Sequence, residues 1–394
     1  MYLSRFGVTD YKCLGDVDVP LTPMHVLIGP NDSGKTSLLE ALAAFCASSE
    51  RSLSEIFPQP WSARELVREN AESDRVRLFG QWTDASATQR LEYGFSVVFP
   101  EEGANCQPAD EWVAVDAERA ELSRWSNTTF LHHSRKNPDD VSGRTHELLV
   151  QIKSVLRPAH KYSFDAKLMA IPAAINPVRR FRMDPDGFGL ATLLDDIVGY
   201  DPELFLRLRR DFCEFFPQFK SMRVETESAL GRSFSLTGIH SASSQTGKGI
   251  YFETRSGKRI RARQASDGAL LFLGFLALVH LPEPPGLLLI EEPENGVYPK
   301  RLGEVIQLLK HMAARTEGVQ IPQIIITTHS PYVVSLFEPE EVTFLGRPAG
   351  DPDAPVRARP LRDALHLRQR LAGGEFYLGE LWYNLTEEEL FGEF

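Results

Sequence analysis

Apolar residues along the chain follow two patterns, short runs typical of strands and longer stretches with helical spacing. Residues 1–28 are predicted to form two short strands with a turn between them, and residues 75–82 and 91–99 a hairpin-like strand pair. Residues 221–264 are expected to form several more strands, the last two joined by a turn at Ser256-Gly257. The pattern therefore predicts two β-rich regions.

Helical spacing follows in four further stretches, residues 35–45, 145–155, 190–197 and 201–216. Asp201, Pro202 and Glu203 form a typical helix start, an N-cap residue followed by proline at the first helical position. The apolar stretch 269–281 is shorter than the roughly 18 residues that cross a bilayer, so it predicts a buried helix and no membrane partner. No long heptad stretch is present, which excludes coiled-coil arms.

The strongest chemical signal is a glycine-rich turn between an apolar run and the helical pattern that begins at Lys35. Its sequence, Gly29-Pro30-Asn31-Asp32-Ser33-Gly34-Lys35-Thr36, has the G-x-x-x-x-G-K-[ST] spacing of a phosphate-binding P-loop. The two glycines allow a tight turn that presents successive N–H groups to an anion. The residues expected to bind nucleotide here are Gly29, Asn31, Ser33, Gly34, Lys35, Thr36 and Ser37.

The P-loop pattern predicts ATP and Mg²⁺ as ligands. Lys35 is expected to reach the β- and γ-phosphates, and the hydroxyl of Thr36 to ligate the metal ion. A chance glycine-rich turn is the alternative interpretation. The intact spacing, with a strand pattern before it and a helix pattern after it, argues against that alternative.

Two later strands are expected to supply the catalytic groups. One apolar run ends in the adjacent acids Glu291 and Glu292, the pattern of a Walker B strand. We assign Glu291 to Mg²⁺ through a water molecule and Glu292 to orienting and deprotonating the attacking water. Another buried run, residues 323–327, delivers His329 to the carboxyl end of the sheet, where open α/β folds bind ligands. His329 is therefore a candidate γ-phosphate sensor, and Glu292, His329 and Lys35 form the expected catalytic set.

A second candidate anion site precedes the apolar helix. Ser266, Asp267 and Gly268 stand at the expected N-terminus of that helix, where backbone N–H groups attract an anion. One chain would have difficulty placing both this site and its own P-loop on the same phosphate chain. We therefore expect two copies of the chain to share each nucleotide, as a homodimer or a larger homo-oligomer.

Four motifs in this order resemble those of the ABC-type ATPases of the RecF, SMC and OLD group. They are the P-loop, Ser266-Asp267-Gly268, the stretch from Leu289 to Gly296 and the stretch from Thr327 to Pro331. The resemblance extends to the compact AAA15/AAA21 ATPases, which have no Toprim domain and many of which are found in prokaryotic defence systems. It implies two heads that sandwich two ATP molecules, with Ser266 and Gly268 contacting the γ-phosphate in trans. It also implies that Asn295 is a D-loop residue and His329 the switch histidine.

The resemblance also implies the fold class. We expect an α/β fold, an ABC-ATPase head in which a mixed and parallel P-loop sheet is flanked by helices, with no coiled-coil arms. The single head would consist of three segments. They are a β-rich N-terminal lobe with the P-loop over residues 1–100, a helical and β insertion over 101–188, and a C-terminal lobe with the other motifs over 189–394.

Several positions depart from the family pattern. Asp32 stands where these families commonly have glycine, and an acid so near the phosphates would weaken ATP binding unless it points outward or contacts Mg²⁺. Ala265 replaces the leucine that usually precedes Ser266-Asp267-Gly268, the signature motif of these families. Glu291 replaces the more frequent aspartate of the Walker B strand. No Q-loop glutamine is assigned, because Gln81 is better explained as a strand-surface residue. Lys12 either touches the nucleotide or has no role in the site.

Composition changes this interpretation little. The four cysteines are scattered without a C-x-x-C pair, so neither a zinc site nor a disulfide framework is indicated, and no secretory leader pattern is present. A cytoplasmic protein is therefore expected. The net charge of −11 does not favour nucleic-acid binding, although a global average can hide a basic face.

Two basic clusters leave sequence-nonspecific DNA or RNA binding open. They are Arg255, Lys258, Arg259, Arg261 and Arg263 on the expected hairpin, and Arg179, Arg180 and Arg182. In a strand, Arg259, Arg261 and Arg263 would share one face, which suits a phosphate backbone. The alternatives are a solvated face or contact with ATP across the dimer.

The leading hypothesis is an ATPase whose ATP-dependent head dimerisation regulates a separately encoded effector or nuclease subunit, or a nucleic-acid clamp, in anti-phage defence. No clustered acidic motif follows His329, so we expect no nuclease site in this chain. The alternatives are a RecF-like DNA-repair clamp and a non-hydrolysing nucleotide-sensing scaffold, for which Asp32 is the main argument. A transporter motor is less favoured, because the signature is degenerate.

Overall fold

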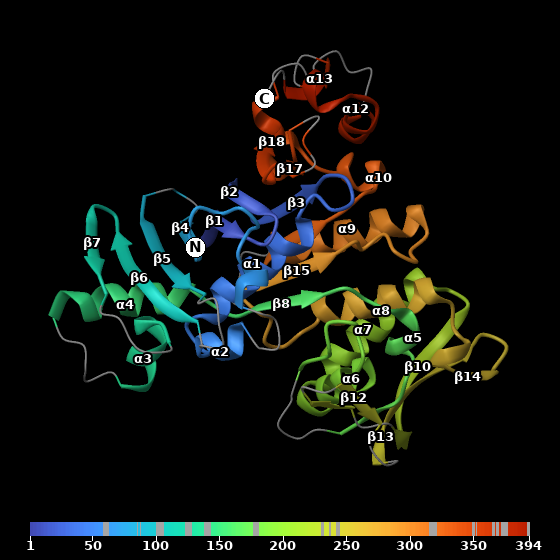
Figure 1. Cartoon of the computed structure of the whole chain (residues 1–394). Coiled ribbons are helices and arrows are strands. Elements are labelled where there is room, and N and C mark those ends of the chain that lie inside the picture. The colour runs from blue at the N-terminus through green and yellow to red at the C-terminus, as the bar shows by residue number, and fades with distance from the viewer. Residues whose placement is uncertain are drawn as a thin grey trace. The chain divides into compact units, whose positions relative to one another are not determined.

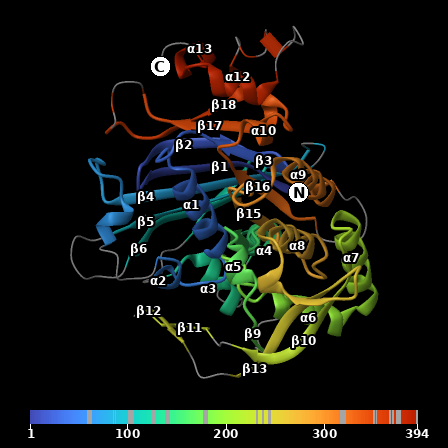
Figure 2. The same cartoon turned by 90° about the vertical axis from the view of Figure 1, so that its right-hand side faces the viewer.

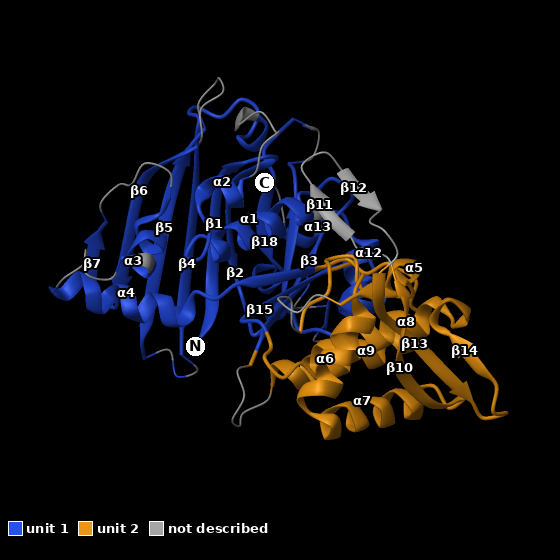
Figure 3. Ribbon diagram, turned by 90° about the horizontal axis from the view of Figure 1, so that it is seen from below, with its two compact units in different colours: residues 1–161, 285–290, 322–394 blue, residues 162–284, 291–321 orange. Residues whose placement is uncertain are grey.

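The protein divides into two compact units that are interleaved along the sequence (Figures 1 and 3). The first unit comprises residues 1–161, 285–290 and 322–394, and the second comprises residues 162–284 and 291–321. The computed structural model describes residues 1–57, 63–84, 86, 88–99, 106–122, 128–137, 143–175, 181–229, 232–235, 238–241, 245–314, 321–348, 351, 353–364, 367, 370–371 and 377–391.

An antiparallel sheet with strand order β2-β1-β4-β5-β6-β7 forms one part of the first unit. Its strands are β1 (Tyr2–Tyr11), β2 (Leu14–Pro20), β4 (Arg75–Thr83), β5 (Arg90–Val98), β6 (Gln107–Val115) and β7 (Glu118–Glu121). In β2, Val17 and Val19 are buried whereas Asp16 and Asp18 are exposed. This alternation, typical of antiparallel strands, leaves one face of the sheet for the core and one for solvent.

Helices α1 (Lys35–Ala47) and α4 (Gly143–Val155) contact this sheet, α1 at β1 and β4 and α4 at β5 and β6 (Figure 2). The ring centroid of Phe45 on α1 lies 5.5 Å from that of Phe6 and 5.6 Å from that of Tyr93. Gly80 makes room for this ring, because a Cβ at Gly80 would lie 2.6 Å from Phe45 Cε1. Burying such a side chain contributes roughly 1.5–3 kcal/mol, so apolar packing anchors α1 and the loop before it. Shorter helices of this unit are α2 (Leu53–Ile56), η1 (Ala63–Leu66) and α3 (Phe130–Lys136).

A second sheet carries the predicted P-loop and has the order β18-β17-β3-β16-β15-β8. Its strands are β3 (Met24–Ile28), β8 (Ala159–Tyr162), β15 (Leu287–Glu291), β16 (Gln323–Thr327), β17 (Val342–Gly346) and β18 (Arg357–Pro360). β3 runs parallel to β16 and β17, whereas β18 is antiparallel to β17. Every residue of β3, β16 and β17 is buried, as expected for central parallel strands. The α/β class with a mixed sheet is thus confirmed.

Short helices complete the C-terminal part of the first unit. They are α10 (Pro331–Val334), η4 (Pro339–Glu341), η5 (Leu361–Asp363), α12 (Leu378–Asn384) and α13 (Glu387–Phe391).

The second unit combines helices with a smaller antiparallel sheet. In that sheet β13 (Gln245–Thr254) pairs with β9 (Ala173–Ala174), β10 (Phe219–Ala229) and β14 (Arg259–Arg261). β11 (Arg232–Ser235) and β12 (Gly238–Ser241) pair with each other in a separate two-stranded sheet. The helices are α5 (Ala166–Met169), α6 (Leu190–Tyr200), α7 (Pro202–Phe215), η3 (Ala262–Gln264), α8 (Asp267–Val279) and α9 (Pro299–Ala313). Phe212 of α7 stacks on Phe252 of β13 with 5.4 Å between ring centroids, which fixes the helix to the sheet.

The start of α7 agrees with the sequence prediction. The side chain of Asp201 accepts a hydrogen bond of 3.0 Å from the Leu204 N–H, and Pro202 is the first helical residue. The expectation of two strands over residues 1–28 is wrong, because three strands form there. The first break comes at Lys12, whose φ is 53°, and β2 begins at Leu14.

Within the described ranges no helix is long and apolar enough to cross a membrane. Among these helices α9, with 15 residues, is the longest.

His25 in β3 gives a testable pH dependence. Its ring is buried between two hydroxyls, with Nε2 3.0 Å from Thr343 Oγ1 and Nδ1 3.2 Å from Thr22 Oγ1. Burial, with a smaller contribution from Arg362, lowers the pKa of His25 from 6.5 to about 3. The unfolded chain therefore binds a proton that the folded chain does not as the pH falls below 6.5. This group costs roughly 1.4 kcal/mol of stability for each pH unit between 6.5 and 3, and nothing above 6.5.

Urea unfolding of wild type and His25→Gln at pH 7.5, 6 and 5 checks this sign. The stability difference between the two proteins should shift in favour of the variant as the pH falls, and His146→Gln, at an exposed position on α4, should show no such trend. A difference that stays constant over this pH range would contradict the assignment.

Candidate functional site

The predicted P-loop connects β3 to α1 in a space that excludes side chains. Gly29 has a φ of 148°, and a Cβ on it would lie 2.2 Å from the carbonyl oxygen of Leu345. Gly34 precedes the first residue of α1 with a φ of 81°, and its Cβ would lie 2.8 Å from Leu14 Cδ2. Both positions therefore require glycine for the backbone angle and for the space.

Lys35 lies folded back onto this loop. Its Nζ donates to the carbonyl oxygens of Gly29 at 3.0 Å and Pro30 at 2.8 Å, and to Ser33 Oγ at 3.3 Å. The side chain is buried, so these acceptors compensate for the loss of water around its charge. A buried ammonium beside the N-terminus of α1 is an arrangement that can bind a phosphate.

Asp32 occupies a left-handed conformation in the middle of the loop, with a φ of 61°. Its backbone carbonyl accepts a hydrogen bond of 2.9 Å from Arg347 Nη1, and the residue is exposed. A left-handed non-glycine residue costs roughly 1–2 kcal/mol, whereas a hydrogen bond from a charged donor contributes roughly 1.5–3 kcal/mol. The bond from Arg347 is therefore large enough to offset the conformational cost of having aspartate there.

His329 reaches the same edge of the sheet as the P-loop. β16 runs parallel to β3, and the Thr328 N–H continues this pairing with a bond of 3.1 Å to the Leu27 carbonyl. His329 thus follows the end of β16 as Gly29 follows the end of β3. Ser330 then caps α10 by accepting a bond of 3.4 Å from the Val333 N–H.

In the second unit, Glu292 and Asn295 come together directly after β15. Glu291 is the last residue of that strand, and Glu292 adopts a φ of 45°. Asn295 Nδ2 donates to Glu292 Oε2 at 2.8 Å, and the Asn295 N–H donates to the Glu292 carbonyl at 3.0 Å. The side-chain bond orients the Glu292 carboxylate, and the backbone bond closes the turn that brings Asn295 to it.

The signature residues lie next to this turn within the second unit. A Cβ on Gly268 would lie 3.7 Å from the carbonyl oxygen of Gly296, the residue after Asn295. Ser266 is the N-cap of α8 but makes no capping hydrogen bond through its side chain, and both Ser266 and Asp267 are exposed. The Ser266 hydroxyl and the N-terminus of α8 are therefore accessible together.

A cleft of about 1050 Å³ beside the P-loop was missed by the sequence interpretation. Its lining includes Lys12, Cys13, Arg68, Asn70, Arg347 and residues 353–355. The cleft adjoins the P-loop because Cys13 Sγ lies 3.8 Å from Ser37 Oγ on α1. Lys12 is ion-paired with Glu40, also on α1. Its size suits a small-molecule ligand. The sequence indicated one of its lining residues, Lys12, as a possible nucleotide contact.

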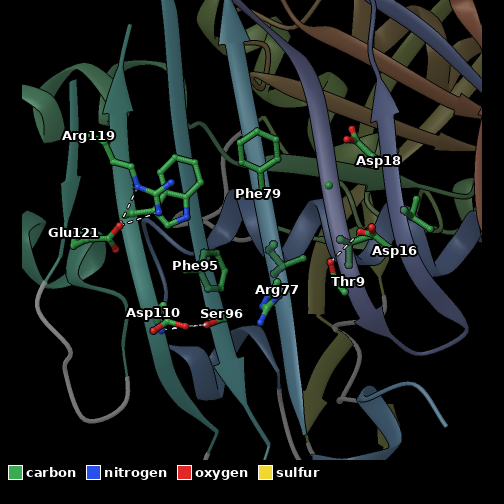
Figure 4. A pocket seen from close by; sticks show the side chains of 15 residues that line it. Thr9, Asp16, Asp18, Arg77, Phe79, Phe95, Ser96, Asp110, Arg119 and Glu121 are labelled. Carbon is green, nitrogen blue, oxygen red and sulfur yellow. Dashed lines mark hydrogen bonds and ion pairs between the residues drawn. The ribbon is translucent and has the colours of Figure 1, made fainter. Parts of the chain in front are cut away.

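A second hollow, of about 420 Å³, lies on the outer face of the antiparallel sheet (Figure 4). The Phe79 and Trp112 rings stack with centroids 5.7 Å apart. Arg119 lies 4.2 Å from the Trp112 ring centroid and Arg5 lies 5.7 Å from that of Phe79. These rings already have partners, so the hollow carries no assigned ligand.

The expected arginine stripe on β14 is wrong. The strand ends at Arg261, where its pairing with β13 stops, and Arg263 lies in the 3₁₀ turn η3. Arg259 is ion-paired with Glu225 and stacks over Tyr251.

In the other basic cluster, Arg179 and Arg180 lie outside the described residues. Gln81 on β4 donates to Ser4 Oγ at 3.3 Å, in keeping with its interpretation as a strand-surface residue.

Two family descriptions match the chain. Residues 137–335 match the family described as "AAA domain, putative AbiEii toxin, Type IV TA system", and residues 1–164 match "AAA ATPase domain". An OLD nuclease of Thermus scotoductus (strain ATCC 700910 / SA-01) is 23% identical over 345 residues, which are 84% of this chain and 59% of that protein. The chain thus spans only part of the length of this relative.

Two solved head domains share the fold. An SMC head bound to the C-winged helix domain of ScpA aligns with a TM-score of 0.54 and 14% identity, over 91% of this chain and 97% of that structure. An SMC head with an extended coiled coil, bound to the C-terminal domain of ScpA derived from Pyrococcus furiosus, gives a TM-score of 0.51 and 12% identity over 94% and 99%. These likenesses show the fold of an ABC-type ATPase head.

The packing around Gly34 predicts a specific cost for a side chain in the loop. Gly34→Ala should lower the melting temperature, because its new Cβ meets both a left-handed backbone and the Leu14 side chain. Gly143→Ala is the matched control, since Gly143 has a φ of 65° but nothing within 4 Å of the Cβ position. Differential scanning fluorimetry should show the larger loss for Gly34→Ala, and equal losses would contradict the role given to local packing.

Proposed function

The chain belongs to the AAA-domain family matched by residues 137–335, and from this premise we propose that it binds and hydrolyses ATP at a site shared by two copies of the chain. At the level of class, the protein is an AAA/ABC-type ATPase related to the OLD nuclease and to SMC heads. One observation carries the proposal. A buried Lys35 is held over a glycine turn at the same sheet edge that His329 reaches.

The P-loop would hold the phosphates, with ATP and Mg²⁺ as the ligands. The residues proposed for this role are Gly29, Asn31, Ser33, Gly34, Lys35, Thr36 and Ser37. Two observations support the fit: the loop has no room for side chains at Gly29 and Gly34, and Thr36 is exposed in the first turn of α1. Thr36 and, through water, Glu291 would hold Mg²⁺, which lowers the charge on the phosphates.

Glu292 is the proposed general base for the attacking water. Its carboxylate oxygen Oε2 accepts a hydrogen bond of 2.8 Å from the Asn295 side-chain amide, which orients the carboxylate, and a carboxylate can orient and deprotonate a water molecule. His329 would sense the γ-phosphate from the end of β16. In this arrangement Asn295 orients the base, and Lys35 neutralises charge on the phosphates.

The trans half of the site would consist of Ser266, Asp267 and Gly268. The Ser266 hydroxyl is exposed at the N-terminus of the 13-residue helix α8 and makes no capping hydrogen bond to it. This supports the role, because helix N–H groups and a hydroxyl together suit a phosphate. Two copies would then close around two nucleotides. Each nucleotide would contact the P-loop of one copy and the signature of the other.

We propose that this closure controls a separately encoded effector in anti-phage defence. The family description, which names a toxin of a type IV TA system, and the nuclease name of the Thermus relative support a connection to an effector. The alternative of sequence-nonspecific nucleic-acid binding has lost its main support, because the three-arginine strand face does not form.

Two substitutions separate nucleotide binding from hydrolysis. Lys35→Ala should weaken MgATP binding at least about tenfold, since it removes the cation that contacts the phosphates. Glu292→Gln should bind MgATP as wild type does, but lose roughly 100-fold in kcat, because an amide cannot accept the proton from water. Fluorescence titration with an ATP analogue and a phosphate-release assay provide the two readouts.

The matched control is Glu283→Gln, an exposed acid in the same unit. Unchanged turnover in Glu292→Gln would remove Glu292 from the catalytic role. ATP binding by wild type without any phosphate release would favour the nucleotide-sensing scaffold.

A further inference from the structure

We infer that Arg347 is a positioning residue for the phosphate-binding loop, an inference that rests on the proposed nucleotide site and extends it beyond the four motifs. Arg347 directly follows β17, and β17 pairs in parallel with β3, the strand that leads into the loop. The side chain therefore starts from the strand adjacent to the loop that it contacts.

Two hydrogen bonds from one guanidinium join two loops. Arg347 Nη1 donates to the carbonyl oxygen of Asp32 at 2.9 Å, and Nε donates to the carbonyl oxygen of Ala354 at 3.0 Å. The planar guanidinium carries these donors in a fixed geometry, so holding one carbonyl fixes the direction in which the other is held. Lysine, with a single flexible ammonium, cannot reproduce both bonds with the same geometry.

The bond to Asp32 orients the peptide that follows it. In a trans peptide the carbonyl and the next N–H point in opposite directions, so holding the Asp32 carbonyl sets the direction of the Ser33 N–H. That N–H donates to the Pro30 carbonyl at 3.3 Å, and the same carbonyl accepts the ammonium of Lys35 at 2.8 Å. Arg347 is thus connected through one turn to the cation of the P-loop.

The hydrogen bond from Arg347 acts on the middle of the loop, which packing does not hold. Packing holds the two ends, since the Gly29 Cβ position is blocked by the Leu345 carbonyl and that of Gly34 by Leu14. Asn31 and Asp32, by contrast, are exposed, and Asp32 has a φ of 61°. The hydrogen bond from Arg347 therefore fixes the backbone conformation at Asp32, where burial does not.

The second bond extends the effect to the cleft beside the loop. Residues 353–355 line that cleft together with Arg347. The following residue, Val356, donates its N–H to the Cys13 carbonyl at 3.0 Å and accepts from the Gly15 N–H at 3.2 Å. Arg347 thus fixes one wall of the cleft and the adjoining phosphate loop at once, which suits a residue that prepares the site before nucleotide arrives.

Arg347→Ala and Arg347→Lys test this role. The alanine variant should raise the Kd and KM for MgATP on the order of tenfold, while kcat stays within about twofold. The reason is that Arg347 positions the loop that binds the nucleotide and touches no reacting atom. The lysine variant should be intermediate. In nucleotide-free protein, hydrogen exchange of residues 30–34 should be faster in the alanine variant than in wild type.

The matched control is Arg357→Ala, at an exposed arginine of β18 in the same unit, which should change none of these quantities. Wild-type exchange and affinity in Arg347→Ala would overturn the inference, as would a loss of kcat with KM unchanged. If the alanine variant does not fold, the lysine variant carries the same readouts, and wild-type values in it would overturn the need for two bonds. If wild type binds no ATP, the proposed function fails, whereas the exchange measurement still decides the role of Arg347.

Discussion

The site depends on one steric constraint, the lack of room for a side chain where β3 turns into α1. A Cβ on any residue at position 29 would lie only 2.2 Å from the carbonyl oxygen of Leu345 on β17. Because β17 is the parallel neighbour of β3, the sheet itself imposes this restriction. The chain can turn here only with glycine and with residues in the left-handed conformation. Such a turn exposes backbone N–H groups at the start of a helix. Sheet packing, loop shape and anion binding are thus successive consequences of one contact.

The chemical groups of the candidate site are distributed over both compact units of the chain. The first unit joins the phosphate loop, Lys35 and His329 through two parallel strands. The second unit joins Glu292 and Asn295 by hydrogen bonds and brings Gly268 against the following turn. Ser266 and the N-terminus of α8 remain exposed in that unit. A helix N-terminus attracts anions, and under the proposed function this one would complete the nucleotide site of a second copy.

Sequence patterns predicted well those features that local rules determine. Asp201 and Pro202 mark the start of α7 because capping and proline geometry act within a few residues. The arginine stripe failed because the length of β14 is set by its pairing with β13, which ends at Arg261. The break at Lys12 was missed because a φ of 53° at a lysine leaves no trace in hydrophobic spacing. Arg347 could not be found at all, since its bond to Asp32 spans 315 residues and exists only because β17 pairs with β3.

The shared site can be tested most directly by mixing two inactive variants, Lys35→Ala and Ser266→Arg. Each should be inactive alone, the first for lack of a phosphate contact and the second because a bulky cation blocks the trans surface. In a mixed dimer, the intact P-loop of one copy faces the intact signature of the other, so one of the two sites is complete. An equimolar mixture should recover roughly a quarter of wild-type ATPase activity, since about half of randomly formed dimers are mixed. Activity no greater than the sum of the separate variants would contradict a site built from two chains.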